Sequence, residues 1–236
     1  MENDRPYRGL LGRLSDHTAC ALLALGAPVA WVPGATVFRE GAEDGHAALL
    51  LTGAVTVWAT GVEGGPTLLA VRSAGDLVGE MAALDGKPRS ATVTACGAVT
   101  ARLIPQHQLL DLLDRHGTVL AELAKAGVDH LRWSNDLRRA MPQQASTRIA
   151  RVLVHLVTRH GRRTADGGWT LDLPLTNIEL ASIAGMKPRT AEKAFSDLRD
   201  TGAVRASARR VVQVPDLAHL ETIAAGHRPE PAPEGG

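Results

Sequence analysis

The chain has 236 residues, 44% of them hydrophobic, and a net charge of +1. It can form one large or two ordinary domains, and it is neither disordered nor uniformly basic. Residues 1–141 hold 13 Lys and Arg against 15 Asp and Glu, whereas residues 142–222 hold 12 against 8. This difference, −2 against +4, predicts separate tasks for the two parts.

The cysteine content and the hydrophobic runs indicate where the chain works. Cys20 and Cys96 are too few for a disulfide framework or a four-thiolate cluster. The longest apolar run, residues 19–32, is broken by Gly26 and Pro28, and no secretory start precedes it. We therefore expect a cytoplasmic protein with no membrane partner.

Residues 29–104 alternate short apolar or β-branched runs with glycine-rich turns, which predicts an antiparallel sandwich or roll. Within them, "VGEMAALDGKPRSATVTA" (78–95) places Glu80 nine residues before Arg89. The spacing around Gly86 does not fit a Walker A loop. An exposed hairpin turning at Asp85-Gly86 would explain the turn but not Glu80.

Beyond Pro105 the periodicity becomes helical, with a short helix to about 115 and a long one over about 118–139. Seven residues of the long helix recur at alternating spacings of three and four: Leu120, Leu123, Gly127, His130, Ser134, Leu137 and Met141. This stripe fits either a helix packed on the sheet or a dimer helix with a weak centre.

Residues 142–222 predict a second domain that contains a helix-turn-helix. Thr176 and Glu179 form a capping box, and Gly185 lies in the turn before a helix that begins at Pro188. The following "AVRASARRVVQV" reads as a β-hairpin wing. The overall class is therefore α+β: a roll with flanking helices (10–115), a dimerisation helix (116–141), a winged helix-turn-helix (142–222) and a disordered tail (223–236).

The second helix of this pair has an apolar face at Ala191, Ala194, Phe195 and Leu198 and a polar opposite face. Taken alone, this pattern would also fit a solvated surface helix. Together with the cap, the turn and the wing, it predicts a DNA-binding domain. We expect a homodimer that binds double-stranded DNA with palindromic half-sites. The candidate DNA-binding residues are Thr176, Lys187, Arg189, Thr190, Lys193, Ser196, Arg209 and Arg210.

Taken in order, residues 10–220 resemble the Crp-Fnr family of bacterial transcription regulators. The resemblance rests on the F-x-E-G of Phe38 to Gly41, on "GEMAALDGKPRSATV", which is similar to the family's phosphate-binding cassette, and on the long helix and the winged unit. It implies a cyclic-nucleotide-binding roll, an effector such as cyclic AMP in place of a cofactor, no enzymatic activity, and RNA polymerase as a partner.

The resemblance also assigns ligand-binding roles by matching position. Glu80 would accept a hydrogen bond from a ribose hydroxyl, and Arg89 and Ser90 would bind the cyclic phosphate. Gly79 opens the cassette, and the amides of Met81 and Ala82 would add donors. Counting from "TRIA" at Thr147 places Trp133 and Ser134 where cyclic-AMP-binding members read the adenine with hydroxyl residues; Ser134 matches and Trp133 departs.

Three alternatives stay open at this point. A cupin-like metal enzyme would need clustered ligands, yet His46 is the only histidine within residues 29–104. A haem protein would need a ligation pattern that these His and Cys residues do not match. A regulator of the same fold could respond to another effector, or bind DNA constitutively.

Overall fold

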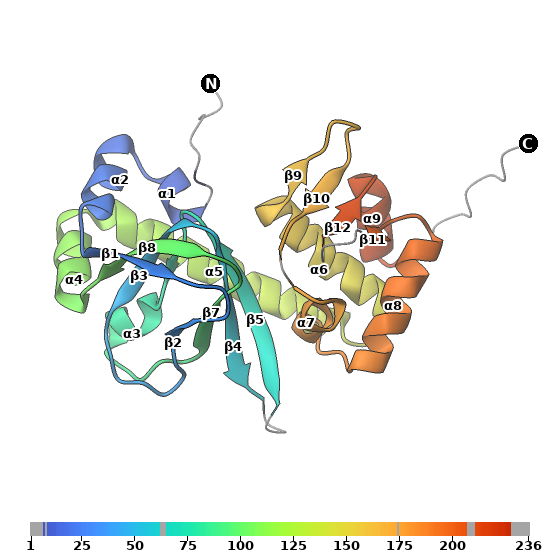
Figure 1. The fold of residues 1–236 in the computed structure, drawn as a ribbon, viewed down its shortest axis with the longest axis horizontal. Helices are drawn as coiled ribbons and strands as arrows, with labels where there is room; N and C mark the ends of the chain where they lie inside the picture. Colours follow the sequence, from blue (N-terminus) through green and yellow to red (C-terminus); the bar gives the residue numbers. More distant parts are fainter. Residues whose placement is uncertain (1–6, 8, 62–64, 174, 207–210, 228–236) are drawn as a thin grey trace, which may run out of the picture. The chain divides into compact units, whose positions relative to one another are not determined.

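The computed structural model describes residues 7, 9–61, 65–173, 175–206 and 211–227. The chain is of the α+β class and divides into two compact units, Met1–Arg132 and Trp133–Gly236, each of which is described by itself (Figure 1). The predicted fold class is confirmed.

The first unit is built on two four-stranded antiparallel sheets, with strand orders β1-β8-β3-β6 and β2-β7-β4-β5. Apart from β4 and β5, neighbouring strands in each sheet are not consecutive in sequence, so the chain passes back and forth between the sheets and forms a roll. The strands are β1 (Ala27–Trp31), β2 (Thr36–Phe38), β3 (Ala47–Thr52), β4 (Ala54–Thr60), β5 (Pro66–Ser73), β6 (Leu77–Val78), β7 (Thr92–Ala95) and β8 (Val99–Ile104).

Strand β3 shows why this sequence makes a layered core. Its residues Ala47 to Leu50 are all fully buried, although side chains alternate between the two faces of a strand. Ala48 and Leu50 pack among the residues of both sheets, whereas Ala47 and Leu49 pack among helical residues. A continuous apolar run therefore fills both the interior of the roll and its helical cover.

Short helices among the described residues cover or interrupt the roll: α1 (Gly9–Arg13), α2 (Asp16–Leu23), α3 (Glu80–Asp85) and α4 (Gln106–Arg115). Helix α2 begins because the Ser15 hydroxyl accepts a hydrogen bond from the Thr18 amide. Helix α4 buries Leu109, Leu112 and Leu113, whose spacing places them on one face.

Helix α5 (Gly117–Ala140) is the longest in the chain, and the division between the two units falls within it. The solvent-exposed apolar residues on this helix differ from the expected stripe. Leu123 packs against the core of the first unit, whereas Leu120, Val128 and Leu131 are 48%, 47% and 58% exposed. Ala124 and Gly127 lie between them and are also exposed. We call residues 120, 124, 127, 128 and 131 the α5 face.

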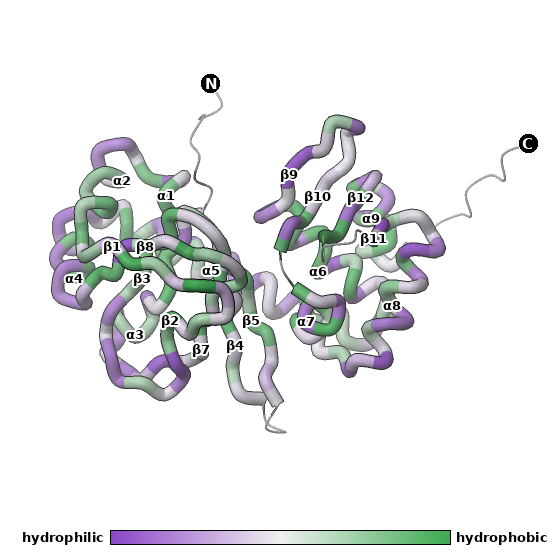
Figure 2. The backbone as a smooth tube through the Cα atoms, in the orientation of Figure 1, coloured by the Kyte–Doolittle hydropathy of each residue, from purple (hydrophilic) through white to green (hydrophobic). Residues whose placement is uncertain are grey.

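In the described part of the second unit, the helices α6 to α9 pack with a small antiparallel sheet of order β11-β12-β10-β9. Its elements are α6 (Ala145–His160), β9 (Arg162–Arg163), β10 (Trp169–Leu171), α7 (Asn177–Ile183), α8 (Pro188–Asp200), β11 (Arg205–Ala206), β12 (Val212–Val214) and α9 (Leu217–Ala224). Helix α6 supplies the centre of the core with Ile149, Val152, Leu153 and Val157. Along α8, hydrophilic and hydrophobic segments alternate (Figure 2).

Helix α9 ends at Ala224 and so includes the first two residues of the segment that was expected to be a disordered tail. Ile223 and Ala224 are buried on α9, and a helical turn ends at Gly226. Residues 228–236 lie outside the described residues. Among the helices that the structure describes, none is both long and apolar enough to cross a membrane.

Candidate functional sites

The cassette begins at Gly79, directly before helix α3, and only glycine fits there. Its φ of 76° lies in the left-handed region. A Cβ atom at this position would lie 2.6 Å from Arg89 Nη1 and 2.7 Å from a ring carbon of Phe38. The same glycine therefore allows both the turn into α3 and the close approach of the arginine.

The turn predicted at Asp85-Gly86 is confirmed, and it ends α3. Gly86 has a φ of 68° and donates its amide hydrogen to the Ala82 carbonyl. The Lys87 amide donates to Asp85 Oδ1 at 3.1 Å. This turn reverses the chain so that Arg89 returns to the beginning of α3.

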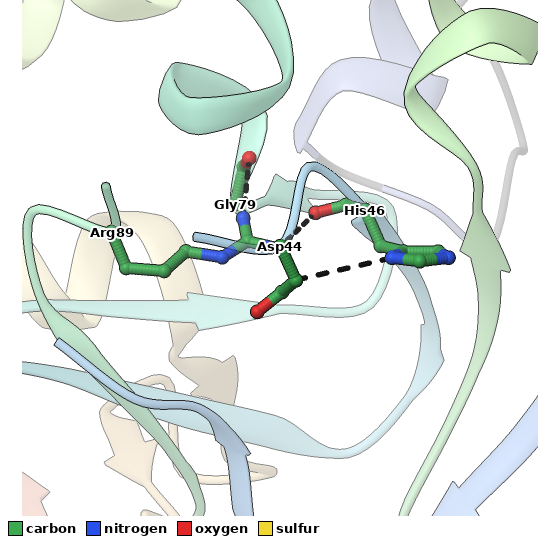
Figure 3. Close-up of polar contacts among 4 residues, drawn as sticks. All are labelled: Asp44, His46, Gly79 and Arg89. Atoms are coloured by element: carbon green, nitrogen blue, oxygen red, sulfur yellow. Dashed lines mark hydrogen bonds and ion pairs between the residues drawn. The ribbon is translucent and has the colours of Figure 1, made fainter. Parts of the chain in front are cut away.

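Arg89 is the centre of the site (Figure 3), and only 2% of its side chain is exposed. Its Nη1 donates to the Gly79 carbonyl at 2.9 Å, and its Nη2 donates to the His46 carbonyl and to the Asp44 carboxylate. The guanidinium carbon lies 3.9 Å from the centre of the Phe38 ring. The structure thus brings Gly79 and Arg89 together, as the motif predicts.

Two backbone hydrogen bonds connect Arg89 to the loop between β2 and β3. The Gly41 amide donates to the Arg89 carbonyl at 2.9 Å, and the Arg89 amide donates to the Ala42 carbonyl at 2.8 Å. Asp44 lies two residues further along this loop, which brings its carboxylate within reach of the guanidinium. Asp44 was not among the predicted site residues, because no periodicity connects a loop residue to a partner 45 positions away.

The two carboxylates near Arg89 have opposite pKa shifts. Burial raises the pKa of Asp44, but the hydrogen bond and the positive charge of Arg89 outweigh it, and the net pKa is lowered. For Glu80 burial dominates and raises the pKa, although its own backbone amide and the charges of Arg72 and Arg89 oppose the shift. Glu80 is therefore a carboxylate held where its charge is poorly solvated.

The other predicted ligand-binding residues lie in several environments. Ala82 is buried, whereas Met81 is 57% exposed and Ser90 is exposed. Ser90 Oγ lies 3.7 Å from the sulfur of Met81. Trp133 and Ser134 belong to the second unit, and the indole of Trp133 stacks on His155 with the ring centres 3.9 Å apart and the planes 7° from parallel.

The helix-turn-helix has the local geometry that the sequence predicts. The Thr176 amide donates to Glu179 Oε2 at 2.6 Å, and the Glu179 amide donates to Thr176 Oγ1 at 3.1 Å, which confirms the capping box. Gly185 has a φ of 64° in the turn, and α8 begins at Pro188. The Thr176 hydroxyl is thus already used in the helix cap.

Helix α8 presents one apolar and one polar face. The predicted inward residues are confirmed as buried: Ala191, Ala194, Phe195 and Leu198. The polar candidates on and beside the helix are exposed, except for half-buried Ser196: Lys187, Arg189, Thr190 and Lys193. Three exposed cations, Lys187, Arg189 and Lys193, lie within seven residues at the beginning of α8, which suits an anionic partner.

The wing is only partly described. Strands β11 and β12 pair as the predicted hairpin, but Arg209 and Arg210 lie outside the described residues. A basic pair that was not predicted lies on β9, at the other edge of the sheet. Arg162 lies 3.2 Å from Asp172, and the Arg163 guanidinium lies 4.8 Å from the centre of the Trp169 ring. The adjacent arginines before a glycine-rich turn were the available signal.

Comparison with known families and proteins agrees with this arrangement. Residues 28–116 match the family "Cyclic nucleotide-binding domain", and residues 147–223 match "Crp-like helix-turn-helix domain". A CRP-like cAMP-activated global transcriptional regulator of Mycobacterium tuberculosis is 26% identical over 78% of this chain and 83% of its own length. Transcriptional activator protein FnrL of Cereibacter sphaeroides is 27% identical over 79% of this chain and 76% of its own.

Solved structures show the same fold. FixK2 from Bradyrhizobium japonicum superposes with a TM-score of 0.72 at 18% identity, covering 84% of this chain and 97% of its own. Within the described residues, no three His, Cys, Asp or Glu side chains cluster as a metal site would require. The two matched domains, in this order in one chain, are those of a transcription regulator rather than an enzyme, and this chain belongs to the Crp-Fnr family of DNA-binding regulators.

Proposed function

We propose that the chain is a homodimeric, cytoplasmic regulator whose affinity for a palindromic DNA site is controlled by a cyclic nucleotide, cyclic AMP in the first place, bound in the roll. The observation that carries this proposal is the buried Arg89 held against Gly79 and beside Glu80. A buried guanidinium at the beginning of a short helix suits a phosphate, because its planar fork can donate to two oxygens at once.

The remaining ligand contacts follow the family assignment. Glu80 would accept a hydrogen bond from the ribose, since its position in the cassette corresponds to that role. Ser90, Met81 and Ala82 would complete the phosphate end, and Ser134 would contact the base. The stacking of Trp133 on His155 occupies one face of its indole, so that a base would contact the other face or the ring edge.

The α5 face supports dimerisation. Leu120, Val128 and Leu131 are large apolar side chains exposed along one side of a helix of 24 residues, with Gly127 among them. A second copy packing on this face would remove them from water and let the two backbones approach closely at the glycine. A dimer also fits a helix-turn-helix, which reads two half-sites.

The DNA interface would consist of α8 and the wing. Arg189, Thr190 and Lys193 are exposed near the beginning of α8, the part of a recognition helix that reaches base edges. Lys187, Ser196, Arg209 and Arg210 would add contacts around it, mainly to phosphates. Thr176 would contribute as the cap that orients α7. RNA polymerase is the proposed protein partner.

One observation favours a second candidate, the same regulator without a cyclic nucleotide. The Arg89 guanidinium donates to the Gly79 and His46 carbonyls and to the Asp44 carboxylate, and these contacts give it a structural role that needs no ligand. Calorimetric titration of the full chain with cyclic AMP and cyclic GMP distinguishes the two candidates. Saturable binding that is lost in Arg89→Leu supports the first, and heats equal to those of dilution support the second.

A further inference from the structure

The hydrogen bonds of Arg89 are unevenly satisfied. Nη1 has the Gly79 carbonyl, and Nη2 has both the His46 carbonyl and the Asp44 carboxylate. Nε is buried and has no hydrogen-bond partner within the described residues. A buried donor without a hydrogen bond costs free energy, so an acceptor that reaches Nε would stabilise Arg89.

The three acceptors differ in whether they can leave. The carbonyls of Gly79 and His46 belong to the backbone at the ends of strands β6 and β3 and cannot turn away. Asp44 is a side chain in the loop between β2 and β3, and 43% of it is exposed. Rotation of its side chain would return the carboxylate to water, where the charge is well solvated. Asp44 is therefore the one anionic and replaceable acceptor.

A phosphate would serve this arginine better than Asp44 does. Asp44 is attached to its loop and accepts only from Nη2, whereas a free phosphate can lie along the edge of the guanidinium and accept from Nη2 and Nε together. Both anions cannot occupy the same edge of one guanidinium, because like charges at contact distance repel. Binding of one must displace the other.

We propose that Asp44 is an internal competitor of the ligand phosphate: its carboxylate holds Arg89 until a cyclic nucleotide takes its place, and it then turns into solvent. This inference rests on the proposed function and deepens it. It explains how Arg89 can be buried and hydrogen-bonded within the chain and still bind a ligand, because the bond to Asp44 lowers the affinity for the ligand without abolishing binding.

The test compares acid variants of the full chain by calorimetry with cyclic AMP and, separately, with cyclic GMP. Asp44→Asn keeps the shape and removes the charge; Asp44→Ala removes the acceptor as well. Asp85→Asn is the matched control, because Asp85 is an acid of the same cassette with 44% of its side chain exposed, close to the 43% of Asp44, and it contacts Lys87. Thermal unfolding of each variant verifies that it is folded.

We expect Asp44→Asn to bind the nucleotide about fivefold to tenfold more tightly than the wild type. This gain corresponds to the loss of one charge-assisted hydrogen bond to Arg89, reduced because Asp44 is partly exposed to solvent. Asp44→Ala should gain at least as much, and Asp85→Asn should stay within about twofold of the wild type, since only the general charge changes. In the double variant Asp44→Asn with Arg89→Leu the gain should vanish, because the competition runs through Arg89.

Equal or weaker binding by Asp44→Asn would overturn the inference, because Asp44 would then position Arg89 rather than compete for it. Nucleotide binding by Asp44→Asn, with no detectable binding by the wild type, would support the inference. If no variant binds either nucleotide, the proposed function fails. The competition between Asp44 and a phosphate is then tested with inorganic phosphate, by measuring how much it raises the unfolding temperature of each variant. Greater thermal stabilisation of Asp44→Asn than of the wild type and Asp85→Asn supports competition, and equal stabilisation contradicts it.

Discussion

At the scale of single residues, Gly79 is required twice over, by its backbone conformation and by its surroundings. Gly79→Ala should destabilise the chain more than Gly86→Ala. Both residues have left-handed φ values, 76° and 68°, so that each alanine carries about 1–2 kcal/mol of strain. Only at Gly79 would the new Cβ also collide with Arg89 and Phe38; around Gly86 no described atom lies within 4 Å. Urea unfolding of both variants measures the difference, and equal losses would contradict this account of the site.

The buried charge of Glu80 lowers the free energy of unfolding at neutral pH. Burial raises its pKa above the ordinary value of 4.5, so that its favourable contribution is complete below about pH 4.5 and is lost as the pH rises through the folded-state pKa. Glu80→Gln should therefore be more stable than the wild type at pH 7 and equal to it at the acid end. Nucleotide binding should nevertheless weaken. Glu43→Gln, in the exposed loop, is the control that should change neither, and a Glu80→Gln variant that is less stable at pH 7 would refute the assignment.

Some residues of the site could be predicted from the sequence, and others could not. Gly79, Glu80 and Arg89 belong to one short segment whose local turn brings them together, and a motif within 12 residues is visible in sequence. Asp44 and Phe38 reach Arg89 through the packing of the β2–β3 loop, which leaves no local pattern. Which acceptors an arginine finds in the folded chain is a property of tertiary structure.

At the scale of elements, the capping box of α7 should be worth a measurable share of stability. Thr176→Ala removes the acceptor of the Glu179 amide and should cost about 1 kcal/mol in the free energy of unfolding. Thr190→Ala, at an exposed position of α8, should cost much less. Chemical denaturation of both variants tests this, and a loss no larger than that of Thr190→Ala would mean that α7 forms without its cap.

Helix α8 should determine which DNA sequence is bound. Lys193→Ala removes an exposed cation from its polar face and should weaken binding to the selected site by about 1–3 kcal/mol, with less effect on unrelated DNA. Arg199→Ala, exposed in the last turn of the same helix, is the control for a general loss of positive charge. Fluorescence anisotropy with specific and unrelated duplexes distinguishes the two effects. A uniform loss in Lys193→Ala would make this residue a phosphate contact.

The elements themselves were easier to predict than their exposed surfaces. Helices α7 and α8 were found because capping residues, a glycine turn and Pro188 are local signals. The stripe expected along α5 included Leu123, which instead packs against the first unit, and omitted Val128 and Leu131, which are exposed. Periodicity identifies a helix, but neighbouring elements decide which of its apolar residues remain in water.

At the scale of the whole molecule, the α5 face should hold two copies together. Leu131→Glu places a charge among the most exposed apolar side chains of α5 and should convert the dimer to a monomer at micromolar concentration. Ala126→Glu adds the same charge at an exposed position outside the α5 face and should leave the dimer intact. Light scattering of both variants decides, and a dimeric Leu131→Glu chain would place the interface elsewhere.

If the proposed function holds, the roll controls how tightly the chain binds DNA. The most direct measurement is a fluorescence titration of one selected palindromic duplex with the full chain, with and without saturating cyclic AMP. We expect tighter binding to DNA with the nucleotide, by a coupling of about 1–3 kcal/mol, and no effect of the nucleotide on DNA binding by Arg89→Leu. Equal affinities of the wild-type chain in the two conditions would contradict it.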